Sequence, residues 1–308
     1  MAQFNMTTHE EFATEDTLRQ YLANQLVLGR LSLVVGAGIS LHFGLPSWST
    51  LVRRLFRDKK GRVPRRSTIE AQAEYFRHKY YEDDESGLMD AVHSALYRGA
   101  KVDFAALRGH TTLAGIGALL MASRRGNVSE VITLNYDDLL EIYLRYHGIV
   151  AQPVVREEHW TGYADVMVYH LHGFVPFRVE DERSERITLD QQSYSKFSIG
   201  TLWGQVALSI MRRRTCLFIG LSGSDKNLDT LLNAVAESHA SREERTRYWG
   251  VTFSTDREND PLRQQWQARN VFFKSVSDYD TDLPKFLFGI CQEAASLWVG
   301  GKVLGRVE

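Results

Sequence analysis

A histidine at the end of a strand, followed by glycine, is suited to general-base chemistry near neutral pH. The segment His-Leu-His-Gly-Phe at residues 170–174 places His172 in this position, directly after an apolar run. His170 and His172 are two residues apart, so on a strand both side chains would point to the same face. Either histidine could instead be a satisfied residue of the core. A zinc pair lacks a convincing third ligand, so we expect no metal site.

A second chemical segment is Thr-Leu-Asn-Tyr-Asp-Asp at residues 133–138, again after an apolar run. The carboxamide of Asn135 can both donate and accept hydrogen bonds, so it can hold a water molecule or a ribose hydroxyl. The carboxylate of Asp137 can accept a hydrogen bond from ribose. The alternative is that Asp137 or Asp138 caps the helix that begins near residue 137.

The third segment, Gly-Ala-Gly-Ile-Ser at residues 36–40, follows the apolar run 31–35. Glycines after a strand allow a tight turn, and their N–H groups can approach a pyrophosphate. Leu41 occupies the third glycine position of the usual dinucleotide pattern. The segment is therefore also consistent with an ordinary turn from strand to helix.

Two further segments could each contact a ligand or have only a structural role. Gly-Leu-Pro-Ser-Trp at residues 44–48 offers Trp48, whose flat surface can shield or stack on a ring, or can pack as a hydrophobic staple for the next helix. Residues 220–228 read Gly-Leu-Ser-Gly-Ser-Asp-Lys-Asn-Leu. There Gly220, Ser222 and Asp225 can face a phosphate or ribose, or can form a turn and a helix cap.

Alternating strands and helices are expected to position these segments. We expect strands at 31–35, 130–134, 152–155, 166–171, 215–219, 247–253 and 271–273. We expect helices at 10–29, 48–56, 111–123, 137–146, 200–213, 227–239, 259–267 and 282–298, with Ser47 and Asp190 as two of the caps. This order predicts an α/β, Rossmann-like fold, in which a mostly parallel sheet carries helices on both faces. Weaker helical patterns at 67–80 and 87–98 predict a helical insertion at about 57–110 within a single domain, 1–308.

Composition excludes several classes of protein. Lys and Arg total 37 and Asp and Glu total 38, so the net charge of −1 creates no overall field for nucleic acid or an anionic membrane. Cys216 and Cys291 cannot form a disulfide framework or a four-thiolate zinc site. The first 30 residues lack an apolar signal core, and the apolar stretch 111–122 is shorter than the about 20 residues that span a bilayer. We therefore expect a soluble, cytoplasmic protein without membrane contact.

In this order, the five segments resemble the sirtuin superfamily, and more narrowly the zinc-less bacterial sirtuin-like NAD hydrolases of antiphage defence. The resemblance covers residues 30–275. It implies that Asn135 and His172 are the catalytic residues. It also implies that NAD is bound by Gly36, Ala37, Gly38, Ser40, Trp48, Gly220 and Ser222. We add Asp137 and Asp225 to this NAD-binding set, because their carboxylates can face the ribose. Ser49 stands where the family has an arginine, which is a departure from the pattern.

The resemblance implies cleavage of the nicotinamide–ribose bond of NAD, with NAD as substrate and no metal. Deacetylating sirtuins carry a four-cysteine zinc module, which this chain cannot form. The alternatives are an NAD-dependent protein deacylase or ADP-ribosyltransferase, a non-catalytic nucleotide-binding subunit, and a nucleic-acid-binding subunit. The last would use a basic run that is also typical of a solvated loop: Arg53, Arg54, Arg57, Lys59, Lys60, Arg62, Arg65 and Arg66.

The resemblance also implies partners. An NAD-depleting effector needs control, so we expect a homo-oligomer and a co-encoded sensor or activator protein, such as a motor ATPase or a short Argonaute. Because about 30 residues lie on each side of the recognised segments, we expect that sensor to be a separate chain. No direct contact with nucleic acid is expected.

Overall fold

A parallel β-sheet forms the centre of the computed structural model. The structure describes residues 10–121, 123, 125–156, 158–159, 163–178, 187–189, 200–221, 223, 225–240, 248–255 and 261–299. Within these residues the sheet has seven strands in the order β3-β4-β2-β1-β5-β6-β7, and every pairing is parallel. The strands are β1 (Leu31–Val35), β2 (Glu130–Thr133), β3 (Ala151–Val154), β4 (Val166–His170), β5 (Thr215–Ile219), β6 (Gly250–Ser254) and β7 (Val271–Ser275). The predicted α/β, Rossmann-like class is confirmed.

The register of the sheet brings the functional segments to one edge. Val35 at the end of β1 is paired with Thr133 of β2 and with Ile219 of β5. Thr133 is paired in turn with His170, the last residue of β4. Four strands therefore end level with one another, and the loops that follow them start from adjacent points. The chain also reverses its direction across the sheet at β1, where open α/β sheets bind their ligands.

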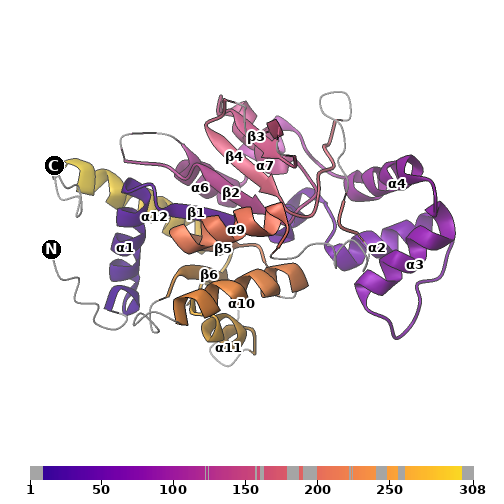
Figure 1. Cartoon of the computed structure of the whole chain (residues 1–308). Helices are drawn as coiled ribbons and strands as arrows, with labels where there is room; N and C mark the ends of the chain where they lie inside the picture. Colours follow the sequence, from indigo (N-terminus) through magenta and orange to yellow (C-terminus); the bar gives the residue numbers. More distant parts are fainter. Residues whose placement is uncertain are drawn as a thin grey trace.

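Helices cover both faces of the sheet (Figure 1). On one face pack α1 (Glu15–Val27), α6 (Thr111–Leu120), α7 (Leu139–Tyr146) and α12 (Asp282–Val299). On the other face pack α9 (Leu202–Arg213), α10 (Lys226–Ala240) and α11 (Pro261–Ala268). Alternate residues of β1 serve the two faces, because Leu33 packs in the first cluster and Val34 in the second. A short 3-10 helix, η1 (Glu10–Phe12), precedes α1.

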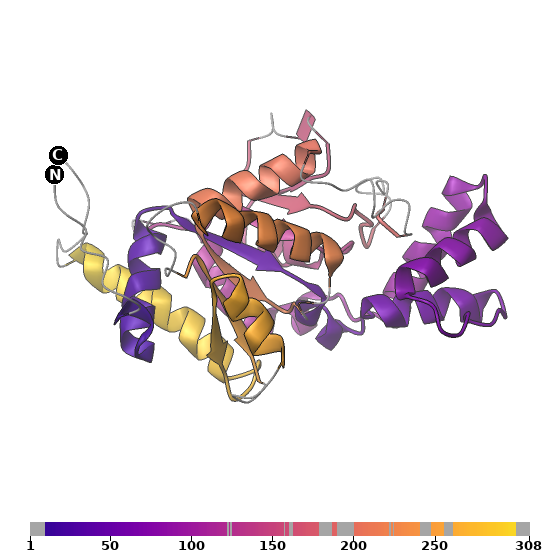
Figure 2. The same ribbon diagram turned by 60° about the horizontal axis from the view of Figure 1, so that its bottom comes forward.

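The segment between β1 and β2 carries a helical lobe, which lies beyond the carboxyl ends of the strands (Figure 2). The chain passes through two 3-10 turns, η2 (Ala37–Ile39) and η3 (Leu41–Phe43), before it enters the lobe. Its helices are α2 (Trp48–Asp58), α3 (Ile69–Tyr81) and α4 (Glu85–Tyr97), followed by the short α5 (Phe104–Arg108). Helices thus occupy the range predicted for the insertion, while the single-domain interpretation stays a prediction. One member of the basic run, Arg54, donates to the carbonyls of Ala95 and Gly44, so it contributes to packing within the lobe.

The predicted helix caps are only partly realised. Ser47 stands at the N-cap of α2, but its hydroxyl makes no capping bond and donates to Thr50 Oγ1 at 3.0 Å. The predicted cap Asp190 lies outside the described residues. Helix α9, predicted at 200–213, has Thr201 as its N-cap, and the Thr201 hydroxyl accepts the N–H of Gly204. Among the described residues, no helix combines the length and the apolar character that a membrane crossing requires.

Candidate active site

The loop after β1 and the loop after β5 lie directly against each other. Gly38 donates its N–H to the carbonyl of Gly220 at 2.9 Å, and a Cβ added at Gly38 would lie 2.6 Å from the Cα of Gly220. Gly220 has a φ of +71°, in the left-handed region that favours glycine. These two positions need glycine because the two backbones cross at close range.

This packing changes the expected role of the glycine loop. The N–H groups of Gly36, Gly38, Ile39 and Ser40 all donate to protein carbonyls. These N–H groups are bound by the end of β5, the loop after it and the η2 turn, so in this structure they are not open to a pyrophosphate. That Gly36, Ala37, Gly38 and Ser40 bind NAD stays a prediction, and Gly36, Ala37 and Gly38 line the cavity together with Ile39.

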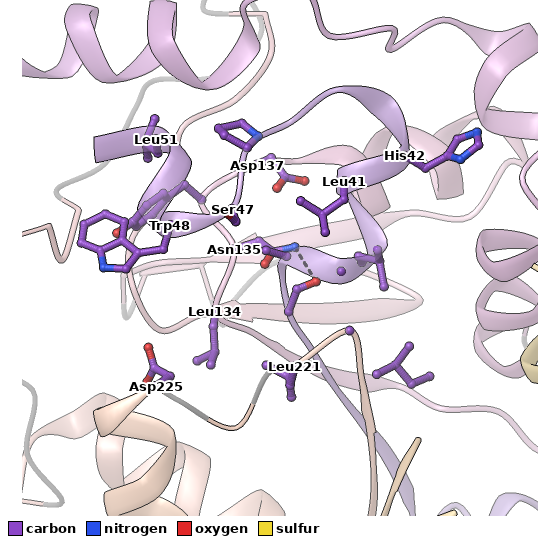
Figure 3. A pocket seen from close by; sticks show the side chains of 18 of the residues that line it. Leu41, His42, Ser47, Trp48, Leu51, Leu134, Asn135, Asp137, Leu221 and Asp225 are labelled. Carbon is purple, nitrogen blue, oxygen red and sulfur yellow. Dashed lines mark hydrogen bonds between the residues drawn. The ribbon is translucent and has the colours of Figure 1, made fainter. Parts of the chain in front are cut away.

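Asn135 lies immediately after β2 and is held by the glycine loop. Its Nδ2 donates to the Gly36 carbonyl at 3.2 Å and to Ser40 Oγ at 3.3 Å (Figure 3). Because Nδ2 has two hydrogens and both are engaged, the carboxamide oxygen is the atom left to accept a hydrogen bond from a ligand. Asn135 lines the cavity and is 8% exposed. The predicted site residue is thus oriented before any ligand arrives.

Asp137 is linked to the same group. It accepts the Ser40 hydroxyl at 3.0 Å and the N–H of Leu139 at 3.3 Å. Burial, and then the nearby Asp138 carboxylate, raise the pKa of Asp137 to about 7. Asp138 stands at the N-cap of α7 without a side-chain capping bond, so it is Asp137 that bonds the first turn. Asp137 therefore both accepts a hydrogen bond from the first turn of α7 and lines the cavity.

His172 lies across the cavity edge, next to the start of α10. Its Nε2 is 3.7 Å from Asp225 Oδ2 and 3.4 Å from Asn227 Nδ2. Burial lowers the pKa of His172, and the Asp225 carboxylate opposes that change only in part. The ring is therefore neutral at pH 7, which is the form a general base requires. Asp225 also caps α10, because its Oδ1 accepts the N–H of Leu228 at 2.8 Å.

The prediction that the two histidines share one face is wrong. Strand β4 ends at His170, and the chain turns before His172, so the alternation of a strand no longer applies. His170 contacts Glu141 on α7, whereas His172 contacts Asp225 and Asn227 at the start of α10, on the opposite face of the sheet.

These residues border one cavity of about 610 Å³, a typical size for a small-molecule site. Trp48 at the start of α2 and Asp225 before α10 lie on the same side of it, and Asn135 lies near its centre (Figure 3). The cavity brings together most of the predicted residues: Gly36, Ala37, Gly38, Trp48, Asn135, Asp137, His172, Gly220 and Asp225. Ser40 does not line the cavity but accepts a hydrogen bond from Asn135 Nδ2, and Ser222 lies outside the described residues.

The cavity also contains residues that the sequence did not single out. Tyr136 contacts Trp48 edge to face, with ring centroids 6.2 Å apart, and its place between Asn135 and Asp137 was a usable signal. Glu70 reaches the cavity from α3 and pairs with Lys226 at 3.5 Å. No local pattern marks Glu70, because its position depends on how the helical lobe docks.

The comparisons with known proteins agree with this arrangement. The profile of a SIR2-like domain matches residues 129–274, which include Asn135, His172 and Gly220. Over these residues, a little under half of its length, the chain is similar to a SIR2-like domain. A curated relative, NAD(+) hydrolase ThsA of Bacillus cereus (strain MSX-D12), is 26% identical over 259 residues, which is 81% of this chain and 49% of the relative. The chain thus spans about half the length of that relative, and the predicted resemblance to the sirtuin superfamily is confirmed.

One group in the wall of the cavity has the residue types of a metal site. Ligand atoms of His42, His110 and Asp280 lie within 4.8 Å of one another. However, His110 Nδ1 accepts the N–H of Leu113 at the start of α6, so the neutral ring carries its proton on Nε2. A metal ion at Nε2 would need the opposite tautomer, and one at Nδ1 would break this cap. The expectation of no metal stays a prediction.

The raised pKa of Asp137 predicts how the stability of the protein changes with pH. Between about pH 4 and 7 the folded carboxyl keeps a proton that the unfolded one loses, so the free energy of unfolding falls as pH rises. Asp137→Asn removes this ionisation and keeps an acceptor for Ser40. We expect its Tm to rise relative to wild type from pH 5 to pH 8, with the exposed Asp90→Asn as control. A Tm difference independent of pH would contradict the assignment.

Proposed function

We propose that this chain hydrolyses NAD at the nicotinamide–ribose bond, releasing nicotinamide, ADP-ribose and a proton. The observation that carries the proposal is the meeting of Asn135 and His172 in one cavity at the carboxyl edge of the sheet. The SIR2-like domain and the similarity to an NAD(+) hydrolase support an NAD-related function.

The chemistry follows from the atoms that face the cavity. Cleavage of the bond leaves positive charge on the ribose, and a water molecule must then reach its anomeric carbon. The Asn135 carboxamide oxygen accepts a hydrogen bond from that water or from a ribose hydroxyl, while the neutral His172 ring takes up the proton. Asp225 stabilises the imidazolium that results, at 3.7 Å. Trp48 shields the nicotinamide side of the site.

The charge of the cavity favours this transition state. Among the described residues that line it, four carry carboxyl groups and none is lysine or arginine; the four are Glu70, Asp137, Asp225 and Asp280. Asp137 keeps a proton up to about pH 7 and Glu70 is paired with Lys226, so Asp225 and Asp280 are the carboxylates that can stabilise positive charge on the ribose.

The first test is nicotinamide release from NAD by the purified chain, measured by chromatography. Asn135→Ala should lower release by about 100-fold, because the reacting water loses its position. Asn127→Ala is a matched control, since that amide donates to the adjacent Val128 carbonyl. Equal release by Asn135→Ala and the control would contradict the role given to Asn135.

We also propose, from the resemblance to defence effectors, that the chain depletes NAD in the cytoplasm as a homo-oligomer under a co-encoded sensor. The assay should therefore be repeated with the protein encoded by the neighbouring gene. Release that appears or rises with that protein would support control by a partner. Bound but intact NAD in both assays would favour a nucleotide-binding subunit without catalysis, and release that requires a protein acceptor would favour a deacylase or ADP-ribosyltransferase.

A further inference from the structure

A buried pair of charged residues lies behind Asn135, outside the cavity. His170 Nε2 is 2.6 Å from Glu141 Oε1, and the two side chains are 0% and 3% exposed. The pair connects the end of β4 to the first turns of α7. The Asn135 loop joins α7 to β2, the strand paired with β4. A buried pair of this kind costs desolvation energy and therefore calls for an explanation.

The second nitrogen of His170 contacts the backbone of the proposed catalytic loop. His170 Nδ1 is 3.1 Å from the carbonyl oxygen of Asn135. A carbonyl only accepts hydrogen bonds, so this contact requires a proton on Nδ1. The Glu141 carboxylate is also an acceptor, so the second contact requires a proton on Nε2 or one shared with Glu141. Both contacts are satisfied together when one proton is on Nδ1 and a second proton lies between Nε2 and Glu141.

The surroundings of His170 favour that state. Burial opposes the charged ring, but the Glu141 carboxylate outweighs it, and the pKa of His170 is raised. The other charged groups nearby are Asp137, which acts on His170, and Asp138, which acts on Glu141. Asp138 is itself bound by the Tyr97 hydroxyl and the Phe177 N–H. The Phe174 ring covers His170 from the side, with centroids 4.7 Å apart.

We propose that His170 and Glu141 are positioning residues that fix Asn135 through its backbone carbonyl. Asn135 is then held at two points, because Gly36 and Ser40 bind its carboxamide and His170 binds its carbonyl. The catalytic consequence rests on the proposed NAD hydrolysis, whereas the arrangement of protons does not. Partners that orient a working side chain typically contribute about 10–100-fold to its activity.

His170→Phe tests this role, because phenylalanine keeps an aromatic ring in the same place but has no N–H to donate to the Asn135 carbonyl. We expect kcat for nicotinamide release to fall about 10-fold at pH 8, with KM for NAD within about twofold. Glu237→Gln, an exposed change on α10, should match wild type throughout. No loss of kcat, or a loss of binding shown by a rise in KM with kcat unchanged, would overturn the proposal.

A measurement on the wild-type chain separates this proposal from the proposed function and does not depend on the folding of a variant. In protein labelled with ¹⁵N-histidine, the His170 resonances, assigned by their loss in His170→Gln, should show a protonated Nδ1 at pH 7.5. A His170 ring without a proton on Nδ1 would overturn the proposal whether or not the chain releases nicotinamide. Absence of release with Nδ1 protonated would instead count against NAD hydrolysis alone.

Discussion

Replacing His172 with alanine should lower nicotinamide release by about 10²–10⁴-fold, the usual contribution of a general base. The ring is the proposed proton acceptor at the cavity edge, and Asp225 Oδ2 lies 3.7 Å from its Nε2, where it can stabilise the charged form. NAD should still bind, because alanine removes no part of the glycine loop or of the Asn135 carboxamide. Release by chromatography and NAD binding by calorimetry measure the two effects separately. His78→Ala on the exposed surface of α3 is the matched control.

The dependence of nicotinamide release on pH provides a second test of His172 as the base. Burial lowers the pKa of His172, so its base form predominates above pH 6.5 and release should stay level there. Release should fall only as pH drops through the lowered pKa, and the residual activity of His172→Ala should lack this acid limb. An alanine variant that keeps most of the wild-type rate, or keeps the same acid limb, would exclude His172 as the base.

The strands and the edge where the site lies were predictable from sequence for a physical reason. Strands of a parallel sheet are buried on both faces, so runs such as 31–35 and 215–219 are mostly apolar and are buried at every position. Because all the strands run in the same direction, their carboxyl ends lie at the same edge of the sheet. The predicted polar residues Asn135, Asp137 and His172 therefore had to lie near one another, and they do.

What could not be predicted depends on contacts between distant segments. The direction of His172 relative to His170 depends on the residue at which β4 ends, because side chains alternate only within the strand. The N–H of Gly38 is occupied by the carbonyl of Gly220, which is 220 − 38 = 182 residues away in the sequence but in direct contact. Glu70 enters the cavity through the docking of the whole helical lobe. None of these contacts leaves a local pattern.

Gly38→Ala should both destabilise the chain and weaken its action on NAD, because the new methyl group would meet backbone rather than a movable side chain. Its Cβ would lie 2.6 Å from the Gly220 Cα and 3.0 Å from the Gly220 carbonyl oxygen. The two loops must therefore separate, at a cost of about 1–3 kcal/mol for overpacking. At roughly 2–4 °C per kcal/mol for a chain of about 150–250 residues, a Tm loss of several degrees is expected.

The same separation moves the carbonyl of Gly36, which accepts from Asn135 Nδ2, so Asn135 loses its orientation together with the wall of the cavity. Displacements of about 1 Å commonly cost 10²-fold in rate, and weakened binding adds to this, so kcat/KM for NAD should fall by more than 100-fold. Gly109→Ala is the matched control, since its Cβ would lie 3.4 Å from the nearest atom and its φ of −79° suits alanine. Thermal unfolding and nicotinamide release of both variants measure the result. If Gly38→Ala behaved like Gly109→Ala, the close crossing of these two loops would not be what positions Asn135.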